Sequence, residues 1–334
     1  MPAHIFVLNE LNFRQCIRRG LVGLPEAKAG SKSEKSVNDA LLSRMALVKE
    51  GDYVLFYITG VKELRGMWKA IGEAFYDENQ VWEDKLYPFR FRLASTEYSF
   101  EKPLKLHDIY DLQNAGKIWT FALNRVSGTN AMFSISDVEF EILLQEYLKI
   151  NPFTIRKNII MEPYPVKPAN IWGKIHRTNN GKPCYEASLM AMLLHDFING
   201  KHQDIFGNYT DYLSYVPTNL GTEMDILLMF GNPKNYLQTM SYDVIEVKLD
   251  RFDGKALHQL IGYESWFIQK KVQGDINMVR TTAIANRFDA DVIDYVQKRE
   301  QFEDKEIKLL RYQISSDGKL QLLPVVNTTD TESL

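Results

Sequence analysis

The feature that most restricts the fold of this chain is an apolar run that carries two charged residues. Residues 244–249 read Val-Ile-Glu-Val-Lys-Leu, and the charged positions are Glu246 and Lys248. Alternate residues of a β-strand face the same side, so these two side chains would point together. Continuous apolar runs are typical of strands that helices cover on both faces of a sheet. The run therefore predicts an α/β sheet. Because burying charge costs free energy, the two charged residues within the run indicate a functional site.

A second acid, Asp225, lies in the preceding apolar run, a predicted strand over residues 224–230. The polar segment between the two runs, residues 231–242, has the composition of a hairpin connection. If the strands pair, Asp225 can reach Glu246. In this arrangement the two acids could hold Mg²⁺ through their carboxylate oxygens. The lysine could stabilise negative charge on a phosphate. The alternative is a solvated face or a surface ion pair of little energy.

The rest of the second half alternates between helical and strand patterns. Apolar spacing predicts helices over residues 185–197, 257–270 and 290–299, and strands over residues 278–285 and 307–314. Such alternation predicts an α/β sheet flanked by helices.

Three motifs in this half resemble the PD-(D/E)XK nuclease superfamily, in particular its branched-DNA and mismatch endonuclease and RecB-like members. They are Gly-Thr-Glu-Met-Asp-Ile-Leu-Leu ending at Leu228, Val-Ile-Glu-Val-Lys ending at Lys248, and His-Gln-Leu-Ile-Gly-Tyr ending at Tyr263. Met224 stands where many members have proline. The resemblance implies a restriction-endonuclease-like fold and a DNA endonuclease that uses Mg²⁺, with Mn²⁺ as a substitute. By position, the implied catalytic residues are Asp225, Glu246, Lys248, Gln259 and Glu186, and the implied metal ligands are Asp225, Glu246 and Glu186.

Some of these positions also have simpler explanations. A glutamate that opens a helix, as Glu186 does, also complements the helix dipole. The basic loop before that helix offers Lys174, Arg177 and Lys182 as contacts to the DNA backbone, because lysine and arginine fix register on phosphates. A solvated surface loop would have the same composition.

The first half of the chain reads as α+β. Strands are predicted over residues 4–8, 53–59, 67–75 and 89–93, and helices over residues 12–19, 37–48 and 136–150. The stretch 151–168 contains four prolines and no periodic apolar pattern, so it is predicted to be a linker. The predicted organisation is therefore a domain over 1–150, a linker over 151–168, a second domain over 169–325 and a tail over 326–334.

Two motifs in the first half resemble a PUA-like β-barrel with helices, of the kind found in EVE and YTH domains. They are Gly-Asp-Tyr-Val-Leu-Phe-Tyr ending at Tyr57 and Val-Trp-Glu-Asp-Lys-Leu-Tyr-Pro ending at Pro88. The resemblance implies that Trp82 and Tyr87 are walls of an aromatic cage for a modified base, which would be read by stacking. Where YTH domains have another tryptophan after the first helix, this chain has Gly-Leu-Val-Gly. For most aromatic residues here a place in the core is the favoured explanation, but the polar neighbours of Trp82 predict an exposed ring.

Composition limits the setting more than the activity. The net charge of −3 means that any basic surface for nucleic acid must be local. The two cysteines, Cys16 and Cys184, and the scattered histidines predict neither a disulfide framework nor a zinc site. No apolar run approaches the ~20 residues of a membrane span, and no secretory signal is evident. A cytoplasmic protein without membrane contact is expected.

Together the two resemblances predict a modification-dependent restriction endonuclease. It would bind double-stranded DNA carrying a modified base and cut nearby. Cutting both strands needs two active sites, which a homodimer would supply. Two alternatives stay open: a repair nuclease for branched or mismatched DNA, and a non-catalytic nucleic-acid-binding protein with a decayed nuclease fold.

Overall fold

The computed structural model divides the chain into two compact units, Met1–Ile175 and His176–Leu334. The residues described are 3–98, 100–123, 131–153, 162–165, 169–218 and 221–325. The predicted tail, 326–334, and part of the predicted linker lie outside them. The described linker residues belong to the first unit, where the backbone N–H of Glu162 donates to Arg18 O at 3.0 Å. The units are divided after Ile175, seven residues beyond the end of the predicted linker.

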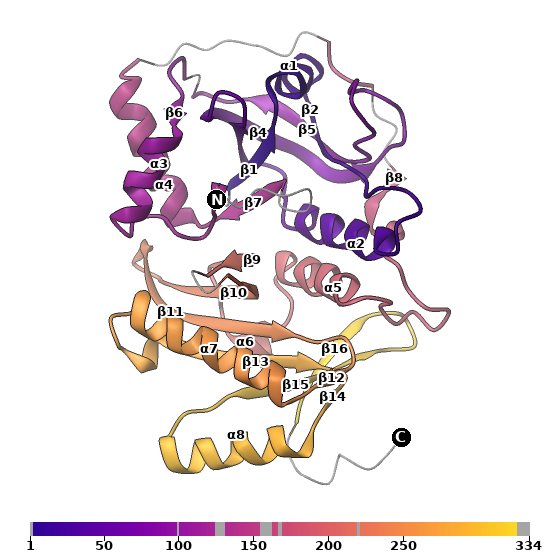
Figure 1. Ribbon diagram of the computed structural model, residues 1–334, viewed down its shortest axis with the longest axis vertical. Coiled ribbons are helices and arrows are strands. Elements are labelled where there is room, and N and C mark those ends of the chain that lie inside the picture. Colours follow the sequence, from indigo (N-terminus) through magenta and orange to yellow (C-terminus); the bar gives the residue numbers. More distant parts are fainter. Residues whose placement is uncertain are drawn as a thin grey trace. The chain divides into compact units, whose positions relative to one another are not determined.

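The first unit is built on one sheet in the order β2-β5-β4-β3-β1-β7, with β6 and β8 also paired to β4 (Figure 1). β1 and β3 are parallel, and the other pairs are antiparallel. The strands are β1 (Ala3–Leu8), β2 (Leu21–Leu24), β3 (Tyr53–Ile58), β4 (Glu63–Tyr76), β5 (Phe89–Ser95), β6 (Leu104–Lys105), β7 (Met132–Ile135) and β8 (Ala169–Asn170).

The helices of this unit are α1 (Glu10–Arg19), α2 (Glu34–Met45), α3 (Leu106–Asn114) and α4 (Asp137–Ile150), with a 3-10 turn, η2 (Ile171–Lys174). The ends of α1 follow from its sequence. The side chain of Asn9 accepts a hydrogen bond from the backbone N–H of Asn12, and Gly20 ends the helix in the left-handed conformation.

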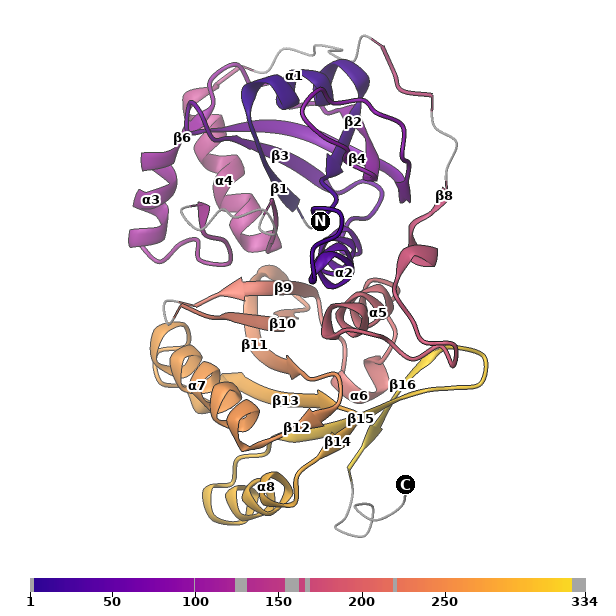
Figure 2. The same cartoon turned by 45° about the vertical axis from the view of Figure 1, so that its right-hand side comes forward.

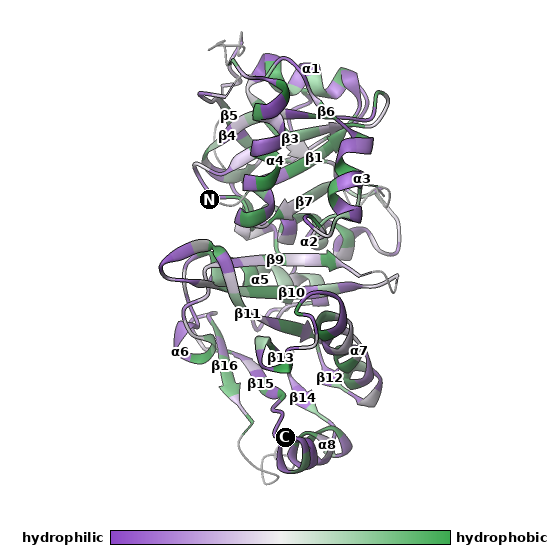
Figure 3. Ribbon diagram, turned by 90° about the vertical axis from the view of Figure 1, so that its left-hand side faces the viewer, coloured by the Kyte–Doolittle hydropathy of each residue, from purple (hydrophilic) through white to green (hydrophobic). Residues whose placement is uncertain are grey.

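Both faces of this sheet are buried, which is why β3 is apolar at every position. Tyr53, Leu55 and Tyr57 belong to the core shared with α3 and α4. Phe56 points to the other face, where its ring packs 5.5 Å from that of Phe13 on α1. β1 is correspondingly hydrophobic in Figure 3.

The sheet of the first unit is open within the residues described, because no pairing joins its end strands β7 and β2. The closed barrel expected from the sequence is therefore not formed by these strands, whereas the mixed α and β character is as predicted. The motif around residues 51–57 does form a central strand.

The second unit contains a six-stranded mixed sheet in the order β16-β15-β13-β11-β10-β9, together with a short parallel pair, β12 and β14. β11, β13 and β15 are parallel neighbours, and the outer pairs are antiparallel. The strands are β9 (Asp211–Pro217), β10 (Glu223–Asn232), β11 (Asn235–Val247), β12 (Arg251–Phe252), β13 (Val279–Ala285), β14 (Arg287–Phe288), β15 (Lys308–Ile314) and β16 (Leu320–Pro324).

Helices flank this sheet, as the alternating pattern predicted. They are α5 (Glu186–Ile198), α6 (Gln203–Phe206), α7 (Gly254–Lys270) and α8 (Ala290–Glu303), with a 3-10 turn, η3 (Ile276–Met278). α7 contacts β11 and β13, and it lies alongside them in Figure 2. α8, largely hydrophilic in Figure 3, packs against α7. None of the described helices is long and apolar enough to cross a membrane.

The hairpin between β10 and β11 is longer than predicted. Its turn lies between Asn232 and Asn235, so most of the segment taken as a connection is strand. Residues 237–241, in the first half of β11, are exposed or partly exposed, as at Met240, which is 52% exposed, and this accounts for their mostly polar composition.

Candidate active site

The β10–β11 hairpin brings Asp225 to Glu246. Ile226 pairs with Ile245 in antiparallel register, so the two acids lie next to this pair on adjacent strands. Asp225 Oδ2 accepts a hydrogen bond from the backbone N–H of Val247 at 2.8 Å. The carboxyl groups of Asp225 and Glu246 are close enough for their negative charges to act on each other. The hairpin alone therefore fixes the relative position of the two acids.

Lys248 follows β11 directly and faces the same cluster. Its Nζ donates a hydrogen bond to Glu246 Oε1 at 2.6 Å. It also lies 3.7 Å from Oε2 of Glu186, the first residue of α5. The side chain of Glu246 is fully buried, whereas those of Lys248 and Glu186 are 25% and 45% exposed. The site is therefore open to solvent on the side of Lys248 and Glu186.

The pKa values of both acids are raised above their usual range. Burial, and then the negative charge of Glu246, raises the pKa of Asp225 well above its usual range. Burial also raises the pKa of Glu246, although Lys248 opposes this. Desolvation lowers the pKa of Lys248, but the surrounding carboxylates outweigh it and the net change is upward. Lys248 therefore keeps its proton, but its single positive charge does not balance the negative charges of the two acids.

The donor set fits a hard divalent cation that binds few protein ligands. Glu246 Oε2 is buried and has no hydrogen-bond partner among the described residues. Nowhere in the described chain do three or more His, Cys, Asp and Glu side chains gather closely enough to hold a metal ion. Mg²⁺ usually keeps several waters and is held by one or two carboxylates, so Asp225 and Glu246 satisfy its requirement. Glu186, predicted as a ligand, contacts Lys248 in this arrangement.

Gln259 and Tyr263, on α7, connect the helix to β10. Gln259 Nε2 donates to Tyr263 Oη at 2.8 Å, and Tyr263 Oη donates to the backbone O of Glu223 at 2.8 Å. Glu223 is two residues before Asp225. Gln259 thus reaches the strand of the site through the hydroxyl group of Tyr263.

The predicted basic loop is divided between the two units. Lys174 ends η2 in the first unit, where its Nζ lies 3.9 Å from the centre of the Tyr76 ring and 3.8 Å from Glu78. Arg177 and Lys182 are exposed in the second unit, on a turn closed by the backbone N–H of Thr178 donating to Lys182 O at 2.8 Å. Only the latter two belong to the unit that contains the acids.

The ring of Trp82 is buried, which corrects the expectation that its polar neighbours would leave it exposed. It is 2% exposed, and the Tyr87 ring and the Arg90 guanidinium lie 5.0 Å and 5.3 Å from it. Arg90 comes from β5, whose contact with Trp82 cannot be read from the residues next to the tryptophan. Tyr87 is only partly buried.

Trp82 and Tyr87 nevertheless line a cavity of about 280 Å³, together with Asn12 of α1. Asn12 Nδ2 donates to Tyr87 Oη at 2.8 Å and to Asp84 Oδ2 at 3.1 Å. Asn12 Oδ1 is buried and has no partner among the described residues. Sequence reasoning missed Asn12, because a helical asparagine one turn after an N-cap residue carries no signal that it faces a cavity.

Comparison with known proteins gives distant matches to two solved structures. No family model and no curated protein match the chain. The structure of EndoMS in complex with double-stranded DNA is 17% identical, and the match covers 41% of this chain and 47% of that chain with a TM-score of 0.28. A repair endonuclease from Pyrococcus abyssi is 16% identical, with 33% and 42% coverage and a TM-score of 0.25. The matched region thus spans less than half of either protein.

Proposed function

We propose that the second unit is a metal-dependent endonuclease that hydrolyses phosphodiester bonds of double-stranded DNA. The observation that carries this proposal is the pairing of Asp225 with the fully buried Glu246, whose Oε2 lacks a partner, beside Lys248. Two mutually repelling carboxylates and a charged lysine at an accessible point of a sheet are costly for a structural role. They are well suited to a site that receives a cation and an anionic substrate.

In this proposal Asp225 and Glu246 hold Mg²⁺, or Mn²⁺ in its place. When bound, the metal lowers the pKa of a coordinated water and neutralises charge on the phosphate. Lys248 keeps its proton and directs Nζ toward the oxygen atoms of the phosphate, where it stabilises the extra negative charge of the transition state. Glu186 holds the other side of the Lys248 ammonium. Gln259 and Tyr263 position β10, and Arg177 and Lys182 contact the DNA backbone.

The test is cleavage of duplex DNA by the full-length chain with Mg²⁺, with Mn²⁺ and with EDTA. Asp225→Asn and Lys248→Ala should each lower kcat by at least about a hundredfold, the usual loss when one charge-stabilising group is removed. Asp243→Asn is the matched control, because Asp243 is a buried acid on the same strand but on its opposite face. Wild-type protein that cuts no DNA with either metal would favour the non-catalytic alternative.

The finer part of the proposal is that the first unit, as a PUA-like domain of the EVE or YTH type, directs cleavage to DNA with a modified base. The cavity beside Trp82 and Tyr87 supports it, because the unpartnered Oδ1 of Asn12 could accept a hydrogen bond from a base edge. The buried ring of Trp82 would then serve as a wall of the cavity and not as an exposed platform.

Substrate choice separates this reading from the repair alternative. Cleavage rates should be compared on methylated, hydroxymethylated, unmodified, branched and mismatched duplexes. A modification-dependent enzyme should prefer one of the modified duplexes, and Asn12→Leu should remove that preference without removing Mg²⁺-dependent hydrolysis. Equal cutting of modified and unmodified DNA, with a preference for branched or mismatched duplexes, would establish the repair function instead. Sedimentation of the protein on DNA would test the predicted homodimer.

A further inference from the structure

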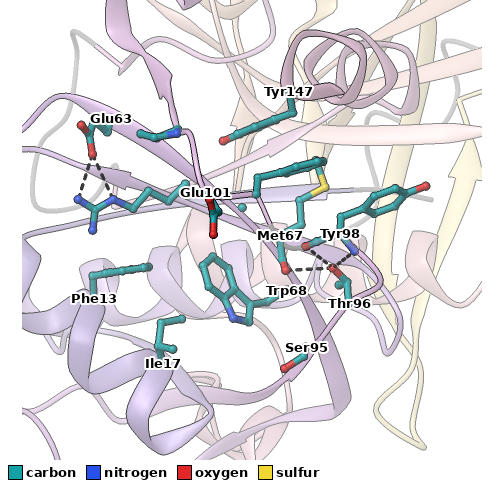
Figure 4. A pocket seen from close by; sticks show the side chains of 14 residues that line it. Phe13, Ile17, Glu63, Met67, Trp68, Ser95, Thr96, Tyr98, Glu101 and Tyr147 are labelled. Carbon is teal, nitrogen blue, oxygen red and sulfur yellow. Dashed lines mark hydrogen bonds and ion pairs between the residues drawn. The ribbon is translucent and has the colours of Figure 1, made fainter. Parts of the chain in front are cut away.

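The charged clusters of the two units differ in their balance of charge. In the first unit, Glu63 lines a cavity of about 410 Å³ and contacts two cations, Arg65 at 3.0 Å and Lys105 (Figure 4). The charge of this carboxylate is therefore compensated by its own neighbours. At the candidate active site of the second unit the ratio is reversed, because one ammonium group serves three carboxylates.

That ammonium group, of Lys248, lies against several oxygen atoms. Its Nζ donates to Glu246 Oε1 at 2.6 Å and to the backbone O of Val247 at 3.1 Å, and it lies 3.7 Å from Glu186 Oε2. The carboxylate of Asp225 attracts it as well. A lysine ammonium group has three donors and no acceptor, so these oxygen atoms hold it as they would hold a small cation. Carboxylate and carbonyl oxygens are also the ligands that hard divalent cations take.

This position of Lys248 conflicts with both tasks proposed for the site. A metal ion at Glu246 Oε1 would meet the ammonium group that lies 2.6 Å from the same oxygen, and two cations so close repel each other. A hydrogen bond directed at Glu246 is also one that Nζ does not offer to a phosphate. The side chain of Lys248 therefore has to move before the proposed reaction.

The structure offers a second carboxylate to the moving ammonium group. The backbone of Lys248 is fixed, because its N–H donates to Ile284 O at 2.8 Å, but its four-carbon stem is flexible. Glu186, at the start of α5, is 45% exposed, whereas Glu246 is fully buried. A turn of the lysine stem toward solvent would thus carry Nζ from Glu246 to Glu186.

We propose that Lys248 holds the place of the metal at Glu246 until a divalent cation enters, and that Glu186 then receives the displaced ammonium group. The inference rests on the proposed function, because it takes Asp225 and Glu246 as the metal ligands. It makes Glu186 a positioning residue for Lys248 and not the metal ligand that the resemblance implied. Nζ becomes available to a phosphate only after the metal position is filled, so cation binding prepares the site for DNA.

The test of the competition is calorimetric titration of the full-length chain with Mn²⁺ at pH 8, without DNA. Lys248→Met should bind Mn²⁺ at least about tenfold more tightly than wild type, because no hydrogen bond to a charged group has to be displaced. Lys248→Gln keeps a hydrogen-bond donor without the charge and should shift the affinity in the same direction, which covers the case that Lys248→Met does not fold. Lys270→Met, the same change of charge at the exposed last residue of α7, is the matched control and should leave the affinity unchanged.

The role of Glu186 is tested by a double-mutant cycle with Lys248. In the wild-type background, Glu186→Gln should weaken Mn²⁺ binding about threefold to fivefold, the worth of an exposed ion pair, because the displaced ammonium group loses its receiver. In the Lys248→Met background the same change should have little effect, because no ammonium group is displaced. An equal loss of affinity in both backgrounds would show that Glu186 binds the metal itself, which overturns its assignment as the receiver.

Failure of this inference can be distinguished from failure of the proposed function. Suppose that wild-type protein binds Mn²⁺ and cuts DNA, while Lys248→Met and Lys248→Gln bind Mn²⁺ no more tightly than wild type. That result would overturn the inference and leave the proposed function intact. Absence of Mn²⁺ binding at millimolar concentration, in wild type and in both Lys248 variants, would overturn both.

Discussion

Asp243 and Glu246 are buried acids on the same strand that serve different ends. Their positions place them on opposite faces of β11. Asp243 is 1% exposed and accepts a hydrogen bond from Thr282 Oγ1 at 2.9 Å. Burial raises its pKa to about 6, although Arg280 opposes the shift. Asp243 is therefore a buried acid of the second unit that has no part in the proposed chemistry, so a neutral residue can replace it.

Asp243→Asn should stabilise the protein at neutral pH. The folded chain keeps the proton on Asp243 up to about pH 6, whereas the unfolded chain releases it near pH 4, so the wild type loses stability as pH rises between these values. A shift of about two pKa units corresponds to about 3 kcal/mol. Urea unfolding should therefore show the variant more stable than wild type by about 1–3 kcal/mol at pH 7, with the difference vanishing near pH 4. A difference that is the same at both pH values would show that ionisation is not its cause.

Cys16 and Cys184 should differ in reactivity. Cys16 is buried on α1, and burial raises the pKa of its thiol to about 12. A rise of about three units lowers the thiolate population about a thousandfold, and the thiolate is the reactive form. An excess of a thiol reagent at pH 8 should label Cys184 rapidly in the native protein and Cys16 only after denaturation. Rapid labelling of both thiols in the native protein would contradict the burial of Cys16.

At this scale, the sequence is informative where partners are near one another along the chain. Glu246 and Lys248 could be placed together because strand alternation is a local rule, and Asp225 followed from the hairpin. The environment of Trp82 could not be deduced, because Arg90 approaches it from another strand. Glu186 and Gln259 were predicted through resemblance alone, since nothing in their local sequence points to the hairpin.

Among the elements, α7 and α8 are joined by a buried ion pair. Arg299 Nη2 donates to Glu264 Oε2 at 2.6 Å, and the two side chains are 9% and 2% exposed. Lys305 Nζ lies 3.8 Å from the same carboxylate. This pair holds α8 to the helix that covers β11 and β13.

Arg299→Met should destabilise the second unit by about 3 kcal/mol, the lower part of the range for removing one member of a buried pair, because Lys305 remains near Glu264. The double variant Arg299→Met with Glu264→Leu should regain much of that loss, since no uncompensated carboxylate is left. Denaturant unfolding of wild type and the three variants, including Glu264→Leu, completes the cycle. A double variant as unstable as the sum of both single variants would show that the two residues do not act as a pair.

Long elements with a clear apolar pattern could be predicted from the sequence. Short strands whose formation depends on a neighbouring strand could not. The helices α4, α5, α7 and α8 and the central strands β3, β10, β13 and β15 were all expected near their observed places, and β11 was expected only from Val244 onward. The strands β2, β7, β9 and β16 were not predicted, because they are short or mixed in composition and depend on a neighbouring strand. The open sheet of the first unit also escaped prediction, since strand content does not decide whether the ends of a sheet meet.

On the scale of the whole molecule, the chain separates its proposed tasks between two units. The described acids and the lysine of the proposed active site all lie in the second unit, and the cavity beside Trp82 lies in the first. The sequence indicated two parts through its prolines. The sequence did not show that the residues just before Ile175 pack with the first unit. There β8 pairs with β4 and η2 contacts β4, which lies far away along the chain.

The β10–β11 hairpin has an evolutionary consequence. It carries Asp225, Glu246 and Lys248 on one uninterrupted stretch of chain, together with the register that aligns them. Exchange of one short piece of gene would therefore transfer the acidic pair and its lysine together. The recipient fold would have to supply only a helix start for Glu186 and a helix face for Gln259. Inheritance of the proposed site could thus outlast similarity in the rest of the chain.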